Sequence, residues 1–413
     1  MIDELEERLD DLRERGLYRK LRLISGPQGP RVLLDGKPVL LLCSNNYLGL
    51  ADHPRVRQAA ADAAMRWGAG AGASRLVSGN MTIHRRLEER IAEFKRSEAC
   101  VLFGSGYLAN TGIIQALARE GDVVFSDALN HASIVDGCRL AGARTFVYDH
   151  CDMEHLEWGL REAAGRGALI VTDGVFSMDG DIAPLAEIVE LAHRYDARVM
   201  VDDAHGTGAL GPGGRGSVHA AGLEDEVDVI TGTLGKALGS YGAYACCSRT
   251  MAKWLVNSAR TLIFSTALPP PAVAAAGAAL DLLAEEPRRV DRLQRNAGIL
   301  RAALAERGMD TGESSTQILP LVVGEADDAV RVCERALEKG VFAQAIRPPT
   351  VSQGSSRLRL AVMASHTRAE LEDAAATLAA AFRAVVGDRP APAPVPLEAP
   401  VVGRIYDGLA EAA

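Results

Sequence analysis

Two apolar segments of the chain end in side chains that could carry chemistry. The segment 199–201 runs into Asp202 and His205, and the segment 229–235 runs into Lys236. Both segments are typical of buried strands, and ligands of open α/β sheets bind at the carboxyl ends of the strands. We therefore expect a carboxylate, an imidazole and an amine to converge on one site.

This set of groups suits the cofactor pyridoxal 5′-phosphate (PLP). A lysine forms an imine with the PLP aldehyde, and a carboxylate keeps the pyridine nitrogen protonated, so that the ring withdraws electrons from the α carbon of an amino acid. Taken singly, Lys236 could be a surface lysine and Asp202 a helix cap. Together at two strand ends, they favour Lys236 as the Schiff-base lysine and Asp202 as the partner of the pyridine nitrogen.

A phosphate-binding turn is expected within residues 103–110. An apolar strand breaks there into Gly104, Ser105 and Gly106 before an apolar helix begins. The backbone N–H groups and the dipole of a helix N-terminus suit a dianionic phosphate, although a plain strand-to-helix turn has the same pattern. His131 follows the next strand, where it could cover a cofactor ring or simply cap a helix.

Three other motifs are incomplete. The pair Gly235–Lys236 lacks the upstream glycine and the following Ser or Thr of a phosphate-binding P-loop. The segment 211–216 matches G-x-G-x-x-G in form, but it lies in a loop beyond its strand and contains Pro212. Thr233 stands where an S-x-x-K hydrolase needs its serine nucleophile. A P-loop enzyme, a dinucleotide-binding protein and a serine hydrolase are therefore not favoured.

The elements that must position these groups alternate between apolar β-rich runs and helical stretches. This alternation predicts an α/β domain with a mostly parallel, buried sheet. The seven expected strands are 99–103, 123–126, 145–148, 168–172, 198–201, 227–231 and 242–246.

The chain divides into four predicted segments. A helix and a hairpin, which turns at Asp35–Gly36, occupy residues 1–53. A large PLP-binding domain covers 54–286, and a small α+β domain covers 287–388. The proline-rich tail 389–413 is expected to be extended and mobile.

Composition limits the partners and the compartment. The net charge of −9 and the pI near 5.6 oppose a polyanion as the main ligand, so we expect no nucleic acid. The seven cysteines are an odd set without C-x-x-C spacing, which suggests neither a disulfide framework nor a zinc site. No apolar run reaches the roughly 18 residues of a membrane span. We therefore expect a cytoplasmic protein with no bound metal.

Four motifs occur in order along the chain, at Ser44–Leu50, Gly72–Arg75, Asp202–Gly208 and Gly232–Ala237. Together they resemble the motifs of the α-oxoamine synthases, which are fold-type-I PLP-dependent transferases. The resemblance runs from about Gly16 to Ala384. It implies a large domain with a seven-stranded, mostly parallel sheet, a small α+β C-terminal domain, PLP as cofactor and a homodimer with shared active sites.

Three further segments, 264–270, 345–351 and 356–360, look most like the family members that act in biotin synthesis. One departure is Ser352, where those members usually have proline. This resemblance implies condensation of L-alanine with a pimeloyl thioester of coenzyme A or of an acyl carrier protein, with release of carbon dioxide and the thiol. A sibling synthase, such as one that joins glycine to acetyl-CoA, would carry the same catalytic residues.

The resemblance also implies a role for individual residues. The catalytic residues would be Lys236, His131, Asp202 and His205. The cofactor would be held by these four and by Gly106, Tyr107, Ser177 and Thr233, with Ser265 and Thr266 reaching a phosphate in the neighbouring subunit. Substrates would be bound by His131, by Asn45 and Arg359 at the amino-acid carboxylate, and by Thr350 and Arg19 at the acyl partner. Arg22 is an alternative to Arg19 at the acyl partner, because it is expected one turn away on the same helix face.

Two more distant alternatives remain. An aminotransferase needs the same lysine and aspartate but no thioester site, and the segment 347–350 weighs against it through resemblance. Some relatives of these synthases are non-catalytic partner subunits that lack the lysine. The presence of Lys236 argues against that reading.

Overall fold

The computed structural model describes residues 2–387, and the predicted proline-rich tail lies outside the described residues. The described chain forms two compact units. We call the first the small unit, which comprises residues 2–47, Met178–Gly180 and 291–387. The large unit comprises Leu48–Ser177 and Asp181–Val290. The domain limits expected from the sequence stay a prediction.

The large unit is built on a seven-stranded sheet of order β4-β10-β9-β8-β7-β5-β6. The neighbouring pairs from β9 to β6 are parallel, and only β10 runs antiparallel to both of its neighbours. The prediction of a mostly parallel seven-stranded sheet is therefore confirmed. The strands are β4 (Ala99–Phe103), β5 (Val123–Asp127), β6 (Arg144–Tyr148), β7 (Ala168–Asp173), β8 (Arg198–Asp202), β9 (Val229–Thr233) and β10 (Ala243–Cys247).

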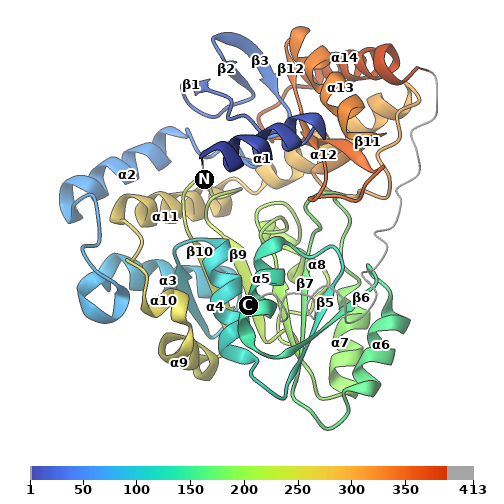
Figure 1. Ribbon diagram of the computed structural model, residues 1–413. Helices are drawn as coiled ribbons and strands as arrows, with labels where there is room; N and C mark the ends of the chain where they lie inside the picture. The colour runs from blue at the N-terminus through green and yellow to red at the C-terminus, as the bar shows by residue number, and fades with distance from the viewer. Residues whose placement is uncertain (1, 388–413) are drawn as a thin grey trace. The chain divides into compact units, whose positions relative to one another are not determined.

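Helices connect these strands, as the crossovers between parallel strands require. Figure 1 shows them alongside the sheet, where α4 packs on β4, β9 and β10, and α7 packs on β8. Because these helices pack on the sheet, the turns between each strand end and the next helix are held in place. The helices are α2 (Pro54–Trp67), α3 (Thr82–Phe94), α4 (Gly106–Leu117), α5 (Ala132–Ala141), α6 (Met153–Glu162), α7 (Leu185–Arg194), α8 (Ser217–Ala220), α9 (Arg249–Ser258), α10 (Arg260–Ile263) and α11 (Pro270–Glu285), with a π-helical turn at Arg75–Gly79 and a 3-10 turn at Pro212–Gly214.

The small unit joins the two ends of the described chain. The N-terminal hairpin pairs in parallel with β12, where Leu40 lies opposite Val341, so the sheet order is β1-β2-β3-β12. A second sheet has the order β11-β14-β13. The elements of the small unit are α1 (Ile2–Glu14), β1 (Ile24–Ser25), β2 (Arg31–Leu34), β3 (Lys37–Leu41), most of α12 (Arg288–Ala305), β11 (Ile318–Gly324), α13 (Ala326–Glu338), β12 (Val341–Phe342), β13 (Gln344–Ile346), β14 (Ser356–Ala361) and α14 (Arg368–Val386).

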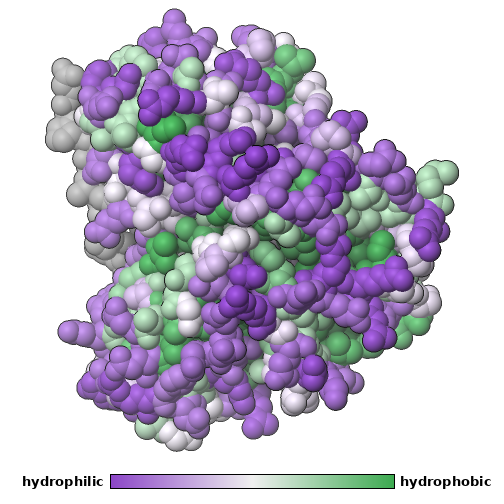
Figure 2. All heavy atoms as spheres, turned by 180° about the vertical axis from the view of Figure 1, so that it is seen from behind, coloured by the Kyte–Doolittle hydropathy of each residue, from purple (hydrophilic) through white to green (hydrophobic). Residues whose placement is uncertain are grey.

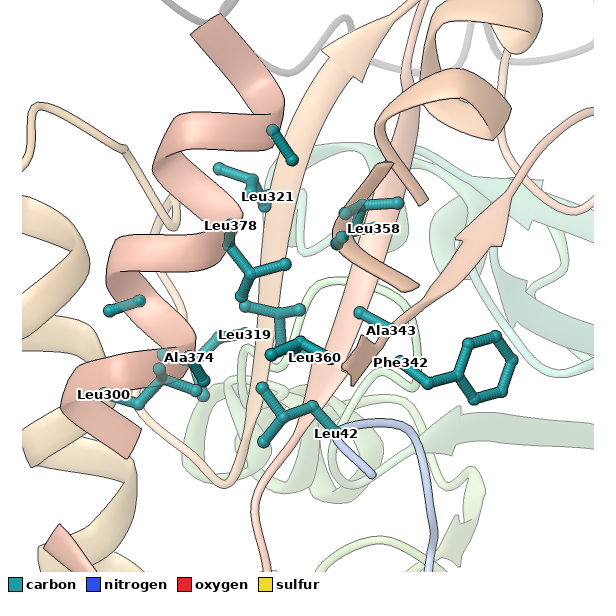
Figure 3. Close-up of a cluster of buried hydrophobic side chains, with 14 of the residues drawn as sticks. Leu42, Leu300, Leu319, Leu321, Phe342, Ala343, Leu358, Leu360, Ala374 and Leu378 are labelled. Atoms are coloured by element: carbon teal, nitrogen blue, oxygen red, sulfur yellow. The ribbon is translucent and has the colours of Figure 1, made fainter. Parts of the chain in front are cut away.

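Strand β14 positions a predicted site residue by simple alternation. Successive side chains of a strand point to opposite faces of the sheet. Leu358 and Leu360 pack into a buried cluster with Ala374 and Leu378 of α14 (Figure 3). Arg359, which lies between the two leucines, must therefore point to the other face.

The first helix ends earlier than the prediction about Arg19 assumed. Gly16 adopts a left-handed φ of 65°, and its N–H donates to the carbonyl of Arg13, which terminates α1. Arg19 and Arg22 lie in a stretch without helix or strand. The expectation that they share a helix face is therefore wrong.

Hydrophilic side chains cover most of the face drawn in Figure 2, with smaller hydrophobic areas between them. This agrees with a composition in which 24% of the residues are charged. Among residues 2–387, none of the helices combines the length and the apolar character that a membrane span needs.

Candidate active site

The predicted lysine and histidine of the large unit lie in direct contact. Lys236 follows β9, and its Nζ lies 2.6 Å from Nε2 of His205. His205 follows β8 and is buried. Because β8 and β9 are parallel neighbours, their carboxyl ends meet at one edge of the sheet, which explains how residues far apart in the sequence meet here.

Asp202 is the last residue of β8, and a buried hydrogen-bond network holds its carboxylate. Its Oδ2 accepts a bond of 2.6 Å from Nδ2 of Asn110, and its Oδ1 accepts one of 2.9 Å from the backbone N–H of Ala204. Asn110 also donates to Ser133 and accepts from Thr231. The carboxylate is thus oriented by α4 and by the turn after β8, while α5 and β9 hold Asn110 in place.

A second acid lies beside Asp202. Asp173 ends β7 and is the register partner of Asp202. Burial first, and then the charge of Asp202, raise the pKa of Asp173 well above its usual range, although Lys236 opposes the shift. The environment therefore favours a neutral Asp173, as expected for two buried carboxyl groups that compete for ionisation.

His131 caps α5, and hydrogen bonds hold both its ring and its backbone. Its Nδ1 lies 2.7 Å from Oγ of Ser133, and its backbone N–H donates to Asp173 at 3.0 Å. Desolvation by the surrounding protein is the main cause that lowers the pKa of His131, while Asp202 raises it and Lys236 lowers it. The ring is nevertheless exposed to solvent, so a flat ligand can reach its face.

The segment 103–110, which was predicted to bind phosphate, passes from β4 into α4. Helix α4 begins at Gly106, and Ser105 caps it by accepting from the N–H of Leu108 at 3.2 Å. The first N–H groups of a helix have no acceptor within the helix, so those of Gly106 and Tyr107 are available to a phosphate. Above Gly106 there is open space, because an added Cβ would meet no described atom within 4 Å.

The remaining predicted cofactor residues also belong to the large unit. Thr233 ends β9. Its hydroxyl donates to the carbonyl of Gly242 and accepts from the N–H of Gly235, so it stabilises the loop 233–242. Ser177 follows β7 on a turn. Ser265 and Thr266 line a small pocket together with Gly104 of the phosphate turn.

The small unit brings together two of the predicted substrate residues. Both terminal nitrogens of Arg359 lie 3.3 Å from Oδ1 of Asn45, and Tyr47 donates to the same oxygen at 3.0 Å. Burial is the main cause that raises the pKa of Tyr47, while Arg359 opposes it. A buried guanidinium braced by neutral partners is suited to a carboxylate ligand.

Arg19 and Thr350, the two residues expected at the acyl partner, are both exposed. Arg347 connects their segments, because it donates to the backbone carbonyls of Gly16 and, at 3.4 Å, Tyr18. Burial is the main cause that lowers the pKa of Arg347, and the nearby charge of Arg19 lowers it further. Arg19 therefore lies near the segment 347–350 without a shared helix.

Four residues that contact predicted site residues, or the segments that carry them, were missed by the sequence analysis. Asn110 and Asp173 of the large unit, and Tyr47 and Arg347 of the small unit, were not among the predicted site residues. Tyr47 and Arg347 lie within segments that the family resemblance had singled out, which was an available signal. Asn110 lies in the segment 103–110 that was expected to bind phosphate, but its contact with Asp202 was not predicted, and Asp173 is placed beside Asp202 only by the pairing of β7 with β8.

Comparison with known proteins assigns the family. The family model for aminotransferases of class I and II matches residues 37–378. The chain belongs to this family. Among curated relatives, the 8-amino-7-oxononanoate synthase of Geobacter sulfurreducens is 55% identical over 382 residues, which is 92% of this chain and 98% of that protein. The 8-amino-7-oxononanoate synthase of Citrifermentans bemidjiense is 56% identical over 372 residues, 89% of this chain and 95% of that protein.

Solved structures agree with this assignment. A serine palmitoyltransferase from S. paucimobilis with bound PLP and myriocin has a TM-score of 0.88 at 32% identity, covering 93% of this chain and 98% of that chain. The crystal structure of 8-amino-7-oxononanoate synthase from Francisella tularensis has a TM-score of 0.73 at 25% identity, covering 84% and 98%. The predicted resemblance and the fold-type-I architecture are confirmed.

Proposed function

We propose that the chain is a PLP-dependent acyltransferase that condenses L-alanine with a pimeloyl thioester. The products are 8-amino-7-oxononanoate, carbon dioxide and the free thiol, in biotin synthesis. The observation that carries the chemistry is the meeting of Lys236 with His205 at the strand ends that also present Asp202. The substrates are taken from the relatives, which share more than half of their sequence with this chain and are named 8-amino-7-oxononanoate synthase.

The donor set of the large unit fits PLP. It offers an amine at Lys236, a buried and oriented carboxylate at Asp202, and helix N–H groups at Gly106 and Tyr107 for a dianion. Thr233, Ser177 and His205 would contribute further polar contacts. We assign these residues to the cofactor, with His131 covering its ring and with Ser265 and Thr266 serving the phosphate in a partner subunit.

When bound, PLP supplies an aldehyde that links to amino groups and a protonated ring that withdraws electrons from the amino-acid α carbon. Asp202 would hold a proton at the pyridine nitrogen. Lys236 would hold the cofactor through its aldehyde, and its amine, when free, would act as the general base for the α proton of the amino acid. Its contact with Nε2 of His205 provides a route by which that proton can be shared.

The substrates would be bound by residues of the small unit. Arg359 offers two parallel N–H donors to the alanine carboxylate, and Asn45 orients the guanidinium. Fixing the carboxylate fixes the α carbon, which converts a random encounter into an aligned one. Thr350 and Arg19 would bind the acyl partner, whose carrier is coenzyme A or an acyl carrier protein.

A comparison of kcat/KM for four substrate pairs tests the assignment. Alanine or glycine is combined with a pimeloyl or an acetyl thioester, since that ratio reports differential transition-state binding. Alanine should exceed glycine by about tenfold, because one methyl group is worth about 1 kcal/mol. Pimeloyl should exceed acetyl by more, at about 0.8 kcal/mol for each buried methylene. If glycine with acetyl-CoA were the best pair, the chain would be a sibling synthase, while turnover without any thioester would indicate an aminotransferase.

We also propose a cytoplasmic homodimer whose active sites are shared. The support is the family resemblance at Ser265 and Thr266, together with the prevalence of closed twofold assemblies. Mixing inactive Lys236→Ala protein with an inactive Thr266 variant, under conditions of subunit exchange, should restore part of the activity. Absence of rescue together with a monomeric mass in solution would contradict the shared site.

A further inference from the structure

A histidine outside the assigned site lies between two carboxylates of the large unit. Nδ1 of His150 lies 2.9 Å from Oδ1 of Asp127, and Nε2 lies 2.9 Å from Oδ2 of Asp181. Asp127 is buried at the end of β5, whereas His150 follows β6 and Asp181 lies in the loop after β7. We call these three residues the His150 clamp.

Each ring nitrogen of His150 lies at hydrogen-bond distance from a carboxylate oxygen, and an imidazolium can donate from both nitrogens at once. The geometry therefore fits a protonated ring with one carboxylate on each side. Desolvation would lower the pKa of His150, but the bonds to Asp127 and Asp181 outweigh it and raise the pKa to about 12. A further polar neighbour is Cys151, whose Sγ lies 3.7 Å from each ring nitrogen.

One end of the clamp fixes the turn that carries His131. Oδ1 of Asp127 accepts from the N–H of Leu129 at 2.8 Å, and its backbone carbonyl accepts from the N–H of Asn130 at 3.2 Å. Its Oδ2 accepts from the N–H of Cys151 at 2.9 Å. Asp127 thus closes the short turn that ends at His131 and ties it to the chain after β6.

The other end fixes the turn that carries Ser177. The carbonyl of Asp181 accepts from the N–H of Phe176 at 3.0 Å, which closes the turn around Ser177. The ring of His150 also packs edge-on against Phe176, with 4.4 Å between ring centroids and an interplanar angle of 89°. The two turns are therefore joined through one imidazolium.

We propose that His150 is a positioning residue that holds the turns of His131 and Ser177 at the distance that the bound cofactor requires. This rests on the proposed function, since His131 and Ser177 are assigned there to PLP. The contacts of His150 given above are with protein groups of the two turns, so it acts through His131 and Ser177 and not directly on cofactor or substrate. Its contribution is preorganisation, because turns that are held in place before the ligand arrives lose less entropy when it binds.

A metal centre is the rival reading of the same residues. The ligand atoms of Asp127, His150 and Cys151 lie within 4.8 Å of one another, a donor set that zinc accepts. Zinc would have to displace the proton from the ring nitrogen that it bound, and with it one of the two bonds from His150 to a carboxylate. We therefore assign the cluster to the clamp and treat zinc binding as a result that would overturn it.

The test measures PLP affinity of the full-length chain after the cofactor has been removed. PLP is titrated into wild type, His150→Gln and Asp181→Asn, well below the melting temperature of each protein, with quenching of tryptophan fluorescence as readout. The dissociation constant should rise about tenfold in His150→Gln, which corresponds to the loss of one charge-assisted hydrogen bond. Asp181→Asn should also raise the PLP dissociation constant. This second variant tests the proposal if His150→Gln does not fold.

His193→Gln is the matched control, because His193 is an exposed histidine of α7 that pairs with one carboxylate, Glu226. It should bind PLP like wild type. Nitrogen-15 NMR of histidine-labelled wild type should show both ring nitrogens of His150 protonated from pH 6 to about 9. A lower melting temperature of His150→Gln with unchanged PLP affinity would overturn the proposal, as would zinc binding that Cys151→Ser abolishes. If wild type itself failed to bind PLP, the proposed function would fail while the protonated clamp would still be visible by NMR.

Discussion

Side chains of the proposed site divide into those that react and those that orient a neighbour. Lys236 and Asp202 could be predicted as site residues from the sequence, because an amine and a carboxylate at strand ends have a chemistry of their own. Asn110 and Asp173 were not assigned a role, although Asn110 lies in the expected phosphate turn and Asp173 follows an expected strand, because the sequence does not show which groups they contact. Their importance arises from contacts with Asp202, which the packing of α4 creates for Asn110 and the pairing of β7 with β8 creates for Asp173.

Replacing Lys236 by alanine should remove both the covalent link to PLP and the general base. Turnover is expected to fall by at least 10²–10⁴-fold, roughly the range of general-base catalysis alone. The purified variant should also lack the yellow colour of the linked cofactor. Absorbance spectra and a coupled assay measure both effects. Lys253→Ala on α9, where the lysine is exposed, is the control and should match wild type; a yellow, active Lys236→Ala protein would refute the assignment.

Replacing Asn110 by alanine should leave the fold intact and leave the neighbouring Asp202 carboxylate less well oriented. The change removes the donor at 2.6 Å from Oδ2 of Asp202, so the carboxylate loses one charge-assisted bond that orients it. We expect kcat/KM to fall about tenfold, which corresponds to about 1.4 kcal/mol. Asn257→Ala, at an exposed asparagine of α9, should have no effect. Unchanged kcat/KM in Asn110→Ala would mean that Ala204 alone orients Asp202.

Strands of the large sheet were predicted to within two residues at each end, for a clear physical reason. Buried parallel strands must be apolar on both faces, so each one is a distinct run between polar turns. The short strands β1, β12 and β13 were not located, since two or three residues give no pattern and depend on their partners. The helix face proposed for Arg19 failed because a single left-handed glycine, Gly16, ends α1 before it.

The turn that presents Asp202 and His205 is held by a buried ion pair that the sequence did not reveal. Nζ of Lys95, at the end of α3, lies 2.8 Å from Oδ2 of Asp203, and both side chains are fully buried. Lys95 also donates to Thr207 at 2.8 Å and to the carbonyl of Arg215. Glycine at positions 206 and 216 leaves room for the Asp203 carboxylate, because an added Cβ would overlap it.

Breaking that ion pair should destabilise the whole large unit. Lys95→Met leaves the Asp203 carboxylate buried without its cation, which costs about 3–5 kcal/mol. The measurement is the urea midpoint of unfolding followed by circular dichroism, with Lys253→Met as an exposed control. The double variant Lys95→Met, Asp203→Asn should recover part of the loss, because the remaining group is neutral. A single variant as stable as wild type would show that water replaces the lysine.

Stability of the chain as a whole should depend on pH through a buried histidine of the small unit. Nδ1 of His366 accepts from the N–H of Met363 at 2.9 Å, and its Nε2 lies 3.1 Å from the carbonyl of Leu41. Desolvation lowers the pKa of His366 to about 4, although the bond to Leu41 opposes the shift. Nε2–H donates to Leu41 of β3 in either protonation state, whereas Nδ1 can accept from Met363 only while the ring is neutral.

The sign of the pH effect follows from the two pKa values. The unfolded chain binds a proton at His366 below about pH 6.5, whereas the folded chain binds it only below about pH 4, so acid favours unfolding in that window. Lowering the pH from 7.5 to 5 should therefore remove about 2 kcal/mol of unfolding free energy through this residue. His366→Gln, which can keep both hydrogen bonds without titrating, should show a smaller loss across that range in urea titrations. His193→Gln should lose as much as wild type, and equal pH slopes for wild type and His366→Gln would assign the acid sensitivity to other groups.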